Sequence, residues 1–190
     1  IGRYTKFVSL KGKVKIESTL RTGMIRFGFG SVGIIDKKYV RTLIELNGIV
    51  SFKGKANFGY GSKVSVGKDG ILQVGERFNI SANSTIICFD SITLGDDVLF
   101  SWDILVMNTD FHETINTITN EPCQGITRPI SLGNNTWVGT RSVILKGTQV
   151  PQNTIVGANS ILSKKYSIDE NCVLGGIPAR VVKRNIKRKI

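Results

Sequence analysis

Residues 132–162 read LGNNTWVGTRSVILKGTQVPQNTIVGANSIL, and an aliphatic residue returns there at every sixth position. These positions are Leu132, Val138, Ile144, Val150, Val156 and Leu162. A small hydroxyl residue follows four positions after each of the first five, namely Thr136, Ser142, Thr148, Thr154 and Ser160. A period of six fits neither a helix with 3.6 residues a turn nor an alternating strand. It is typical of a short strand and a corner repeated around a prism, with the aliphatic side chain pointing inward.

The same period continues upstream in a less regular form. Buried-type residues recur there at spacings of six or eight, at Phe52, Phe58, Val66, Val74, Ile80, Ile86, Leu94, Phe100 and Val106. Each spacing of eight is interpreted as a corner with two extra residues. Gly67, Gly75 and Gly95 directly follow three of these positions, where the backbone must adopt a positive φ or lie close to the next coil. The repeat therefore spans residues 52 to 163, and three hexads a coil predict a parallel β-helix of roughly six coils.

The chain of 190 residues is predicted to form one all-β domain with three parts. Residues 1–51 are expected to be irregular N-terminal edge coils, residues 52–163 the β-helix, and residues 164–190 a C-terminal extension with a basic tail. The composition is 41% hydrophobic, as in ordinary globular proteins, and no run of about 18 apolar residues is present. A transmembrane helix is therefore not expected.

The cysteines and the single histidine limit the chemistry. Cys88, Cys123 and Cys172 are odd in number and far apart, which favours reduced thiols in a cytoplasmic protein over a disulfide framework. No CxxC pair exists, and one histidine cannot supply the three ligands of a carbonic anhydrase on such a fold. No metal site is expected.

A polar loop, residues 108–129, interrupts the repeat and contains that histidine, His112. A long loop in a compact repeat protein usually carries function or is disordered. His112 lies six residues after Val106, so it should emerge at a corner of the prism. Histidine titrates near neutrality, as a general base requires. Asp110 and Glu113 flank it and could orient the ring or remain solvated, and the residues alone also allow a loop histidine bonded to backbone.

These features together resemble the hexapeptide-repeat acyltransferases, in particular the maltose, galactoside and colanic-acid O-acetyltransferases. The resemblance rests on the repeat, the loop 108–112, the re-entry 129–139 and the ending 175–183, and it covers residues 52–183. It implies a left-handed parallel β-helix with an extruded loop, a homotrimer, and acetyl-CoA bound in a cleft between adjacent subunits. Left-handed coils are contrary to the usual right-handed crossover, so the handedness comes from the resemblance alone.

The resemblance also implies roles for individual residues. His112 would remove the proton from an acceptor hydroxyl as its oxygen attacks the thioester. Asn83, two positions after the matching residue Ser81, and Asp110 would contact the acceptor, while Phe89 stands where the family has an acidic residue and leaves the sugar open. Residues implied to bind acetyl-CoA are Trp137, Gly139, Thr140, Ala158, Ser163, Lys164, Arg180 and Lys183.

The predicted function is acetyl transfer from acetyl-CoA to a hydroxyl of a sugar or polysaccharide precursor. An N-acetyltransferase acting on an amino sugar stays open because the same base serves an amine, as does a noncatalytic structural or surface-binding β-helix. The net charge of +12 could attract CoA phosphates, nucleic acid or anionic lipid. Nucleic acid is not expected as a partner, because the four tyrosines are scattered. The basic tail is instead expected to make peripheral contact with the anionic inner membrane.

Overall fold

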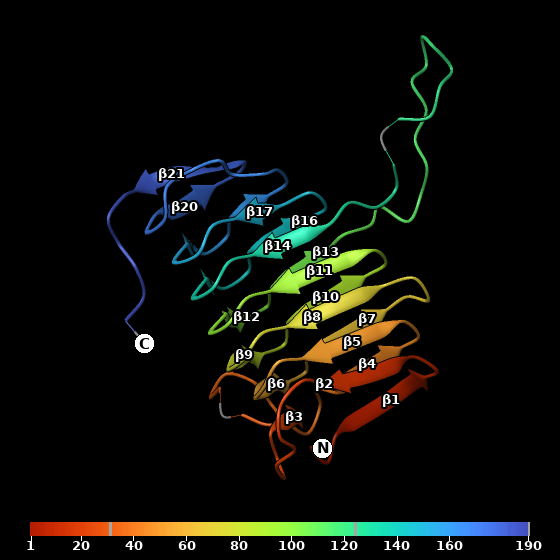
Figure 1. Cartoon of the computed structure of the whole chain (residues 1–190), viewed down its shortest axis with the longest axis vertical. Helices are drawn as coiled ribbons and strands as arrows, with labels where there is room; N and C mark the ends of the chain where they lie inside the picture. The colour runs from red at the N-terminus through yellow and green to blue at the C-terminus, as the bar shows by residue number, and fades with distance from the viewer. Residues whose placement is uncertain (31, 124, 190) are drawn as a thin grey trace.

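The computed structural model describes residues 1–30, 32–123 and 125–189, and Figure 1 shows it as a stack of coils that rises from the N-terminus. Three sheets form the sides of a prism. The first sheet contains, in spatial order, Thr5–Leu10 (β1), Thr42–Leu46 (β4), Lys63–Val66 (β7), Thr85–Cys88 (β10), Leu105–Met107 (β13), Val143–Leu145 (β16) and Ile161–Leu162 (β19).

The other two sheets follow the same order of coils. The second sheet contains Lys13–Ile16 (β2), Ile49–Phe52 (β5), Ile71–Val74 (β8), Ser91–Leu94 (β11), Ile130–Leu132 (β14) and Gln149–Val150 (β17). The third contains Ile25–Phe27 (β3), Ala56–Tyr60 (β6), Phe78–Ala82 (β9), Leu99–Trp102 (β12), Trp137–Val138 (β15), Ile155–Val156 (β18), Val173–Gly176 (β20) and Ala179–Lys183 (β21). Neighbouring strands are parallel except for β20 and β21, which close the stack as an antiparallel pair.

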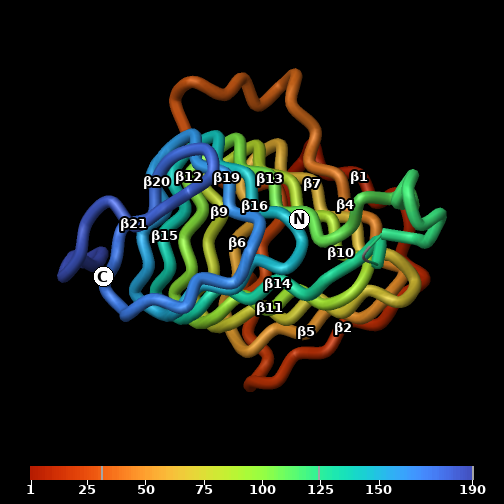
Figure 2. Tube along the Cα trace, turned by 90° about the horizontal axis from the view of Figure 1, so that it is seen from above, coloured from red at the N-terminus to blue at the C-terminus, as the bar shows by residue number. Residues whose placement is uncertain are grey.

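Each turn of the chain visits the three sheets in sequence, so three corners run along the prism. We call the edge between the first and second sheets the first corner, that between the second and third sheets the second corner, and that between the third and first sheets the third corner. Viewed from above, the coils superpose into one outline from which longer segments project (Figure 2). Among the described residues no helix is long and apolar enough to cross a membrane.

The six-residue period produces the core as predicted. Ile86, Val106, Ile144 and Leu162 are partners in successive strands of the first sheet, and all four are fully buried. The other four residues of the six-residue period, Leu132, Val138, Val150 and Val156, are at most 5% exposed. Inward side chains therefore stack in columns along the prism axis, and this burial stabilises the coils only when they are stacked.

The hydroxyl residues of the repeat lie at the corners, where three of the five side chains bond the backbone of their own turn. Thr136, Thr154 and Ser160 each donate a hydrogen bond of 2.7 Å to the carbonyl three residues earlier. All five hydroxyl positions of the repeat are fully buried. A larger side chain would not fit inside these bends, which explains the small residue in each hexad.

Glycine serves close approach between coils in the upstream part of the repeat. A Cβ on Gly75 would lie 2.3 Å from the carbonyl carbon of Gly95, and one on Gly67 would lie 2.7 Å from the ring of Phe89. Neither glycine has a positive φ, so these glycines serve the close approach of the next coil and not a left-handed turn. Positive φ values occur instead at corner residues such as Asn135, Asn153 and Asn159.

The N-terminal region differs from the expectation of irregular edge coils for residues 1–51. Strands β1, β2 and β3 pair in parallel with β4, β5 and β6, so the regular coils begin at Thr5. The sequence hides this because β1 and β2 belong to the end coil, where most side chains are exposed and no inward period is needed. Only the connections remain irregular, notably residues 28–41 at the third corner, of which residue 31 lies outside the described part.

Candidate active site

The loop predicted at residues 108–129 is a two-limbed arm that leaves the prism at the first corner, between β13 and β14. Its two limbs pair at the base, where the amide of Asp110 donates to the carbonyl of Ile126 at 3.0 Å and that of Arg128 donates to Asn108 at 3.1 Å. Isolated bridges join Thr109 to Thr127 and Ile115 to Pro122. We call residues 108–129 the arm.

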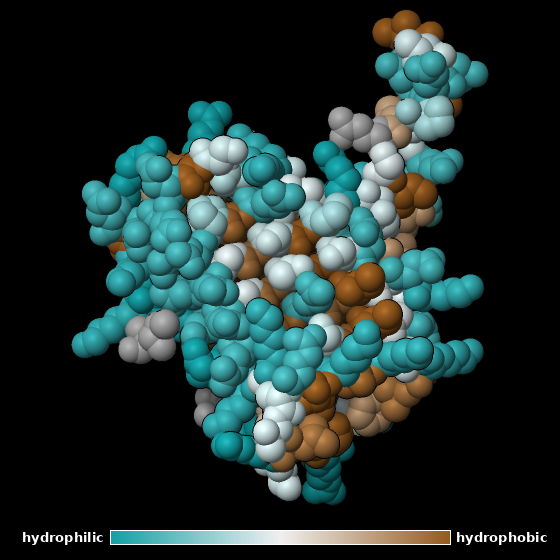
Figure 3. All heavy atoms as spheres, in the orientation of Figure 1, coloured by the Kyte–Doolittle hydropathy of each residue, from teal (hydrophilic) through white to brown (hydrophobic). Residues whose placement is uncertain are grey.

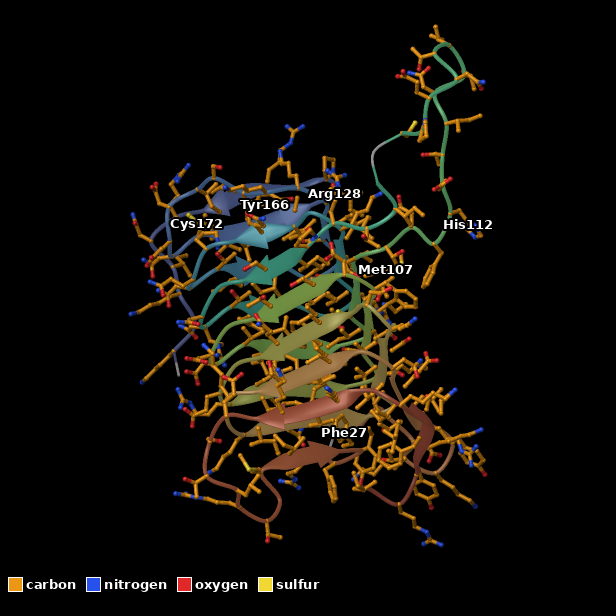
Figure 4. All side chains as sticks on the ribbon, turned by 45° about the vertical axis from the view of Figure 1, so that its right-hand side comes forward. Phe27, Met107, His112, Arg128, Tyr166 and Cys172 are labelled. Carbon is orange, nitrogen blue, oxygen red and sulfur yellow. The ribbon has the colours of Figure 1, made fainter. Side chains whose placement is uncertain are left out.

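His112 lies at the root of the arm and points away from the prism (Figure 4). Its side chain is exposed and forms no hydrogen bond with any described residue. The preceding residue, Phe111, has a φ of 60°, which is strained for an aromatic side chain. The ring of Phe111 packs edge-on against Phe89, with centroids 5.0 Å apart. This contact holds the turn that projects His112 outward and leaves the imidazole exposed.

Lys146 ties the two limbs of the arm to the coil above. Its Nζ atom lies 2.5 Å from Oδ2 of Asp110 and donates to the carbonyl of Gly125 at 3.0 Å. Only 14% of the Lys146 side chain is exposed, so this contact is partly shielded from water. Asp110, which the sequence suggested as an acceptor contact, is therefore engaged by a cation beside His112. Sequence reasoning missed Lys146, since nothing in the period links it to the arm.

Asn108 fixes the point at which the arm departs. Its side chain is fully buried, accepts a 2.8 Å hydrogen bond from the amide of Phe89 and donates one of 3.3 Å to the carbonyl of Ser91. Among the described residues, the amide of Phe89 has no hydrogen-bond acceptor other than Asn108. Asn108 thus couples the arm to the turn that carries Phe89.

A hollow of about 580 Å³ lies at the first corner on the N-terminal side of the arm. It is lined by Lys11, Glu45, Asn47, Gly67, Lys68 and Phe89. Phe89 forms the end nearest the arm and is 36% exposed. The hollow therefore shares a wall with the aromatic contact that supports the turn before His112.

The residues predicted for the pantetheine part of acetyl-CoA gather at the third corner. Thr140 and Ala158 lie in stacked turns, because the amide of Asn159 donates to the carbonyl of Thr140 at 2.9 Å. A Cβ on Gly139 would lie 2.7 Å from the amide nitrogen of Ala158, so only glycine allows this approach. Within the described chain, the amides of Thr140 and Ala158 donate no hydrogen bond and remain available to a ligand.

Trp137 lies beside this corner on the outer face of the third sheet. Its ring is 36% exposed, and its indole nitrogen donates to Oγ of Ser101 at 3.1 Å. A half-exposed tryptophan held by one hydrogen bond can form the wall of a cleft. The same contact is also ordinary packing between neighbouring coils.

The residues predicted to meet the nucleotide occupy the last coil and the closing strand. Ser163 and Lys164 follow β19 at the first corner, and both are exposed. Arg180 and Lys183 are exposed on β21, opposite Gly175 and Val173 of β20. Cations thus surround the C-terminal end of the prism on more than one side.

One subunit does not bring the predicted site together. His112 and Asp110 belong to the first corner, whereas Thr140, Ala158 and Asn83 belong to the third. A strand of the first sheet separates these corners, and four or five extended residues span roughly 13 to 17 Å. Asn83 has a φ of 49° and donates to Oδ1 of Asp103 at 2.5 Å, as a corner residue does.

The outer face of the first sheet between these corners is apolar in the upper coils. Outward and half-buried side chains there are Ile87, Leu105, Met107, Val143, Leu145 and Ile161. An outward face of a solvated sheet is normally polar. The signal was present in the sequence, because the strands at 105–107, 143–145 and 161–162 are apolar at every position instead of alternating.

The basic C-terminal tail is partly docked. It descends along the second corner beside a hydrophilic surface (Figures 1 and 3). The guanidinium of Arg188 donates to the carbonyl of Asp97 and, at 3.0 Å, to Oδ1 of Asn135. Loss of hydration in this contact lowers the pKa of Arg188. Within the basic tail, Arg188 is therefore engaged with the prism.

No set of three His, Cys, Asp or Glu side chains that could hold a metal ion occurs among residues 1–30, 32–123 and 125–189. Cys88, Cys123 and Cys172 are free thiols. Burial raises the pKa of the Cys88 thiol to about 12, which makes it a poor nucleophile. On the arm, His112 is exposed together with Glu113 and Glu121, and it is the histidine of the chain.

We compared the chain with known protein families and solved structures. Residues 129–164 match the family model described as hexapeptide repeat of succinyl-transferase. No curated protein matches the chain by sequence. Among solved structures, the polysialic-acid-specific acetyltransferase NeuO is 21% identical, with a TM-score of 0.62 over 98% of this chain and 72% of that one.

Two further structures have the same fold. The polysialic acid O-acetyltransferase OatWY is 20% identical, with a TM-score of 0.57 over 98% of this chain and 92% of that one. A maltose O-acetyltransferase from Clostridium difficile 630 is 20% identical, with a TM-score of 0.50 over 96% of this chain and 71% of that one. Residues 129–164 therefore carry a hexapeptide repeat, and the chain has the left-handed β-helix fold of these solved structures.

Proposed function

We propose that the protein is an acetyltransferase that moves an acetyl group from acetyl-CoA to a hydroxyl of a sugar or glycan, with His112 as the general base. The observation that carries this proposal is the arm, which anchors a strained turn through Asn108 and Lys146 and leaves His112 exposed at its root. The fold shared with sugar and polysialic acid acetyltransferases supports the same reading.

The active site is shared between subunits of a homotrimer. Each prism would turn the apolar outer face of its first sheet toward a common axis, because that face otherwise stays in water. In a closed threefold ring this arrangement sets the first corner of one subunit beside the third corner of the next. His112 would then face Thr140 and Ala158 of the neighbouring copy, which one subunit alone keeps apart.

The residues fit acetyl-CoA along this cleft. The free amides of Thr140 and Ala158 would donate to amide carbonyls of the pantetheine arm, and Trp137 would wall it. Lys164, Arg180 and Lys183 are exposed cations suited to phosphate groups. When bound, acetyl-CoA supplies an activated acetyl group as a thioester.

His112 accepts the proton of the acceptor hydroxyl as the oxygen attacks the thioester carbonyl, and the proton then passes to the departing thiolate. Transfer is direct, without a covalent intermediate on the protein. General base catalysis of this kind contributes about 10²- to 10⁴-fold in rate. The pair of Asp110 and Lys146 holds the arm in position beside the ring and does not itself exchange the proton.

The decisive experiment tests both the base and the shared site. His112→Ala should lower acetyl transfer at least about 100-fold with an unchanged melting temperature, because the ring is exposed and lies outside the core. Glu113→Gln, the next residue on the arm, is the matched control and should retain activity. Wild-type turnover in His112→Ala would refute the mechanism.

Mixed trimers then test the assembly. His112→Ala and Ala158→Trp, which fills the cleft, should each be inactive alone. Coexpressed subunits should recover about a quarter of wild-type activity, because a random ring pairs an intact base with an intact cleft in that share of its sites. Sedimentation should give three times the 20.8 kDa chain mass. No recovery in mixed trimers would show that the site lies within one subunit.

A further inference from the structure

We infer that the hollow at the first corner is the acceptor subsite and that it takes an acidic sugar, whose ring packs on Phe89 and whose carboxylate pairs with Lys68 and Lys11. This inference rests on the proposed function, since it assigns the acceptor of the reaction that His112 would catalyse. It also explains the aromatic residue at position 89, which the sequence left without a role.

The position of the hollow connects it to the base. Phe89 lines the hollow at one end and packs edge-on against Phe111, the residue before His112. A ring seated on Phe89 would therefore present its hydroxyls toward the root of the arm. A volume of about 580 Å³ holds one or two sugar rings.

The shape of the aromatic wall is fixed by backbone contacts. Gly67 leaves room for the ring of Phe89, because a Cβ there would lie 2.7 Å from it. The amide of Phe89 is held by the buried side chain of Asn108. Phe89 is thus a rigid, 36% exposed apolar platform of the kind on which the apolar face of a sugar ring packs.

The polar wall of the hollow contains two lysines and one glutamate. Glu45 is its one acidic residue, and both of its oxygens are used: Oε2 accepts from Ser65 at 2.6 Å and Oε1 from Asn47 at 3.2 Å. Lys11 and Lys68 are exposed and form no ion pair with any residue that the structure describes. An incoming carboxylate would therefore find two uncommitted ammonium groups, whereas an amino sugar would be repelled.

The chemistry of the hollow thus selects among acceptors. A neutral hexose gains only the aromatic contact, while an acidic sugar gains the aromatic contact and a charge pair. Matched probes separate these contributions: the methyl glycosides of glucuronic acid and of sialic acid, each as the free carboxylate and as its methyl ester. The ester keeps the ring and removes only the charge.

Binding is measured first, by ligand-observed NMR on the whole protein without donor. The carboxylate form of at least one glycoside should bind at least tenfold more tightly than its ester, and Lys68→Ala should reduce that difference. Phe89→Ala should weaken acid and ester alike. Lys55→Ala, which removes the same charge at the second corner, is the matched control and should keep the preference.

Acetyl transfer is measured second, with the same probes and acetyl-CoA. A carboxylate preference in binding that Lys68→Ala leaves intact would overturn the inference, as would equal binding of acid and ester to the wild-type protein. Transfer to neutral glycosides that depends on His112 but not on Lys68 would overturn it while leaving the proposed function standing. Binding with the expected preference but without any transfer would reject the acetyltransferase proposal and retain the acidic-sugar site.

Discussion

Lys146 Nζ lies 2.5 Å from Oδ2 of Asp110, across 36 residues of sequence, and it also bonds the carbonyl of Gly125 on the opposite limb of the arm. One ammonium group therefore closes the root of the arm beside His112. Lys146→Met keeps the aliphatic stem and removes the charge. We expect it to lower kcat about tenfold with little change in KM for acetyl-CoA, because a misplaced base costs rate and not donor binding.

A structural effect would look different from this positioning effect. Limited proteolysis should cut the arm of Lys146→Met faster than that of the wild type, while the melting temperature of the prism stays the same. Lys146→Arg should restore part of the rate, since it can bridge both limbs. A variant with normal kcat and an arm that proteases cut freely would show that the clamp does not serve catalysis.

The fold was largely predictable because its signal is periodic. Each inward residue of 132–162 could be named from spacing alone, since burial in a coil depends on position within the hexad. The contacts at the root of the arm could not be predicted in this way. The arm interrupts the six-residue period between Asp110 and Lys146, so their spacing in the sequence does not indicate that they meet. Phe89 was noted as an unusual residue, yet its contact with Phe111 depends on a positive φ that no spacing reveals.

Asn108 offers a test of how the arm is anchored. Its buried amide accepts from Phe89 and donates to Ser91, so Asn108→Ala removes both hydrogen bonds and leaves the amide of Phe89 without its acceptor. A buried polar group without a partner costs about 1 to 3 kcal/mol. We expect the free energy of unfolding to fall by about 2 to 4 kcal/mol in urea titrations. Asn116→Ala, on the exposed outer limb, is the control. Equal stability of Asn108→Ala and the wild type would mean that water replaces the amide.

The pair of Arg77 and Asp97 should make stability depend on acid. The hydrogen bond from Arg77 to Asp97, 2.7 Å long, lowers the pKa of the Asp97 carboxyl from its ordinary 3.8. A depressed pKa in the folded state adds stability above the unfolded value, and that stability is lost as the pH falls through the folded value. Asp97→Asn should therefore have a lower urea midpoint than the wild type at pH 7, and the difference should shrink below pH 3.8.

A second ion pair provides the matched control. Asp169 faces Arg184 at 3.3 Å, but 92% of its side chain is exposed. Exposed pairs contribute little, so Asp169→Asn should match the wild type at both pH values. A constant difference between Asp97→Asn and the wild type down to pH 2 would assign the effect to the backbone of this corner and not to the charge.

The same limits apply to the predicted site as to the fold. His112 could be placed at a corner from its distance to Val106, because the strand length fixes where a coil turns. The sequence did not show at which corner each predicted cofactor residue lies. Thr140 and Ser163 belong to different corners, although their hexads look alike. The apolar outer face of the first sheet could be read from the sequence, and it would have suggested the assembly that we propose.

Because Arg188 is docked on the prism, the proposed membrane contact of the tail can be tested separately for each basic residue. Arg188 is bound to Asp97 and Asn135, so Arg188→Ala should lower the unfolding free energy by about 1 to 2 kcal/mol, as expected for charge-assisted hydrogen bonds. It should leave binding to anionic liposomes unchanged, because its charge is already engaged.

Lys187 and Lys189 are exposed. If the tail contacts anionic lipid as proposed, Lys187→Ala and Lys189→Ala should each weaken liposome binding by about 1 kcal/mol without a change in stability, and salt should reduce the effect. Liposome flotation at two ionic strengths, paired with urea titrations, measures both quantities. Loss of liposome binding in Arg188→Ala alone would mean that the tail undocks to reach the membrane, and unchanged binding in all three variants would reject the tail as a membrane contact.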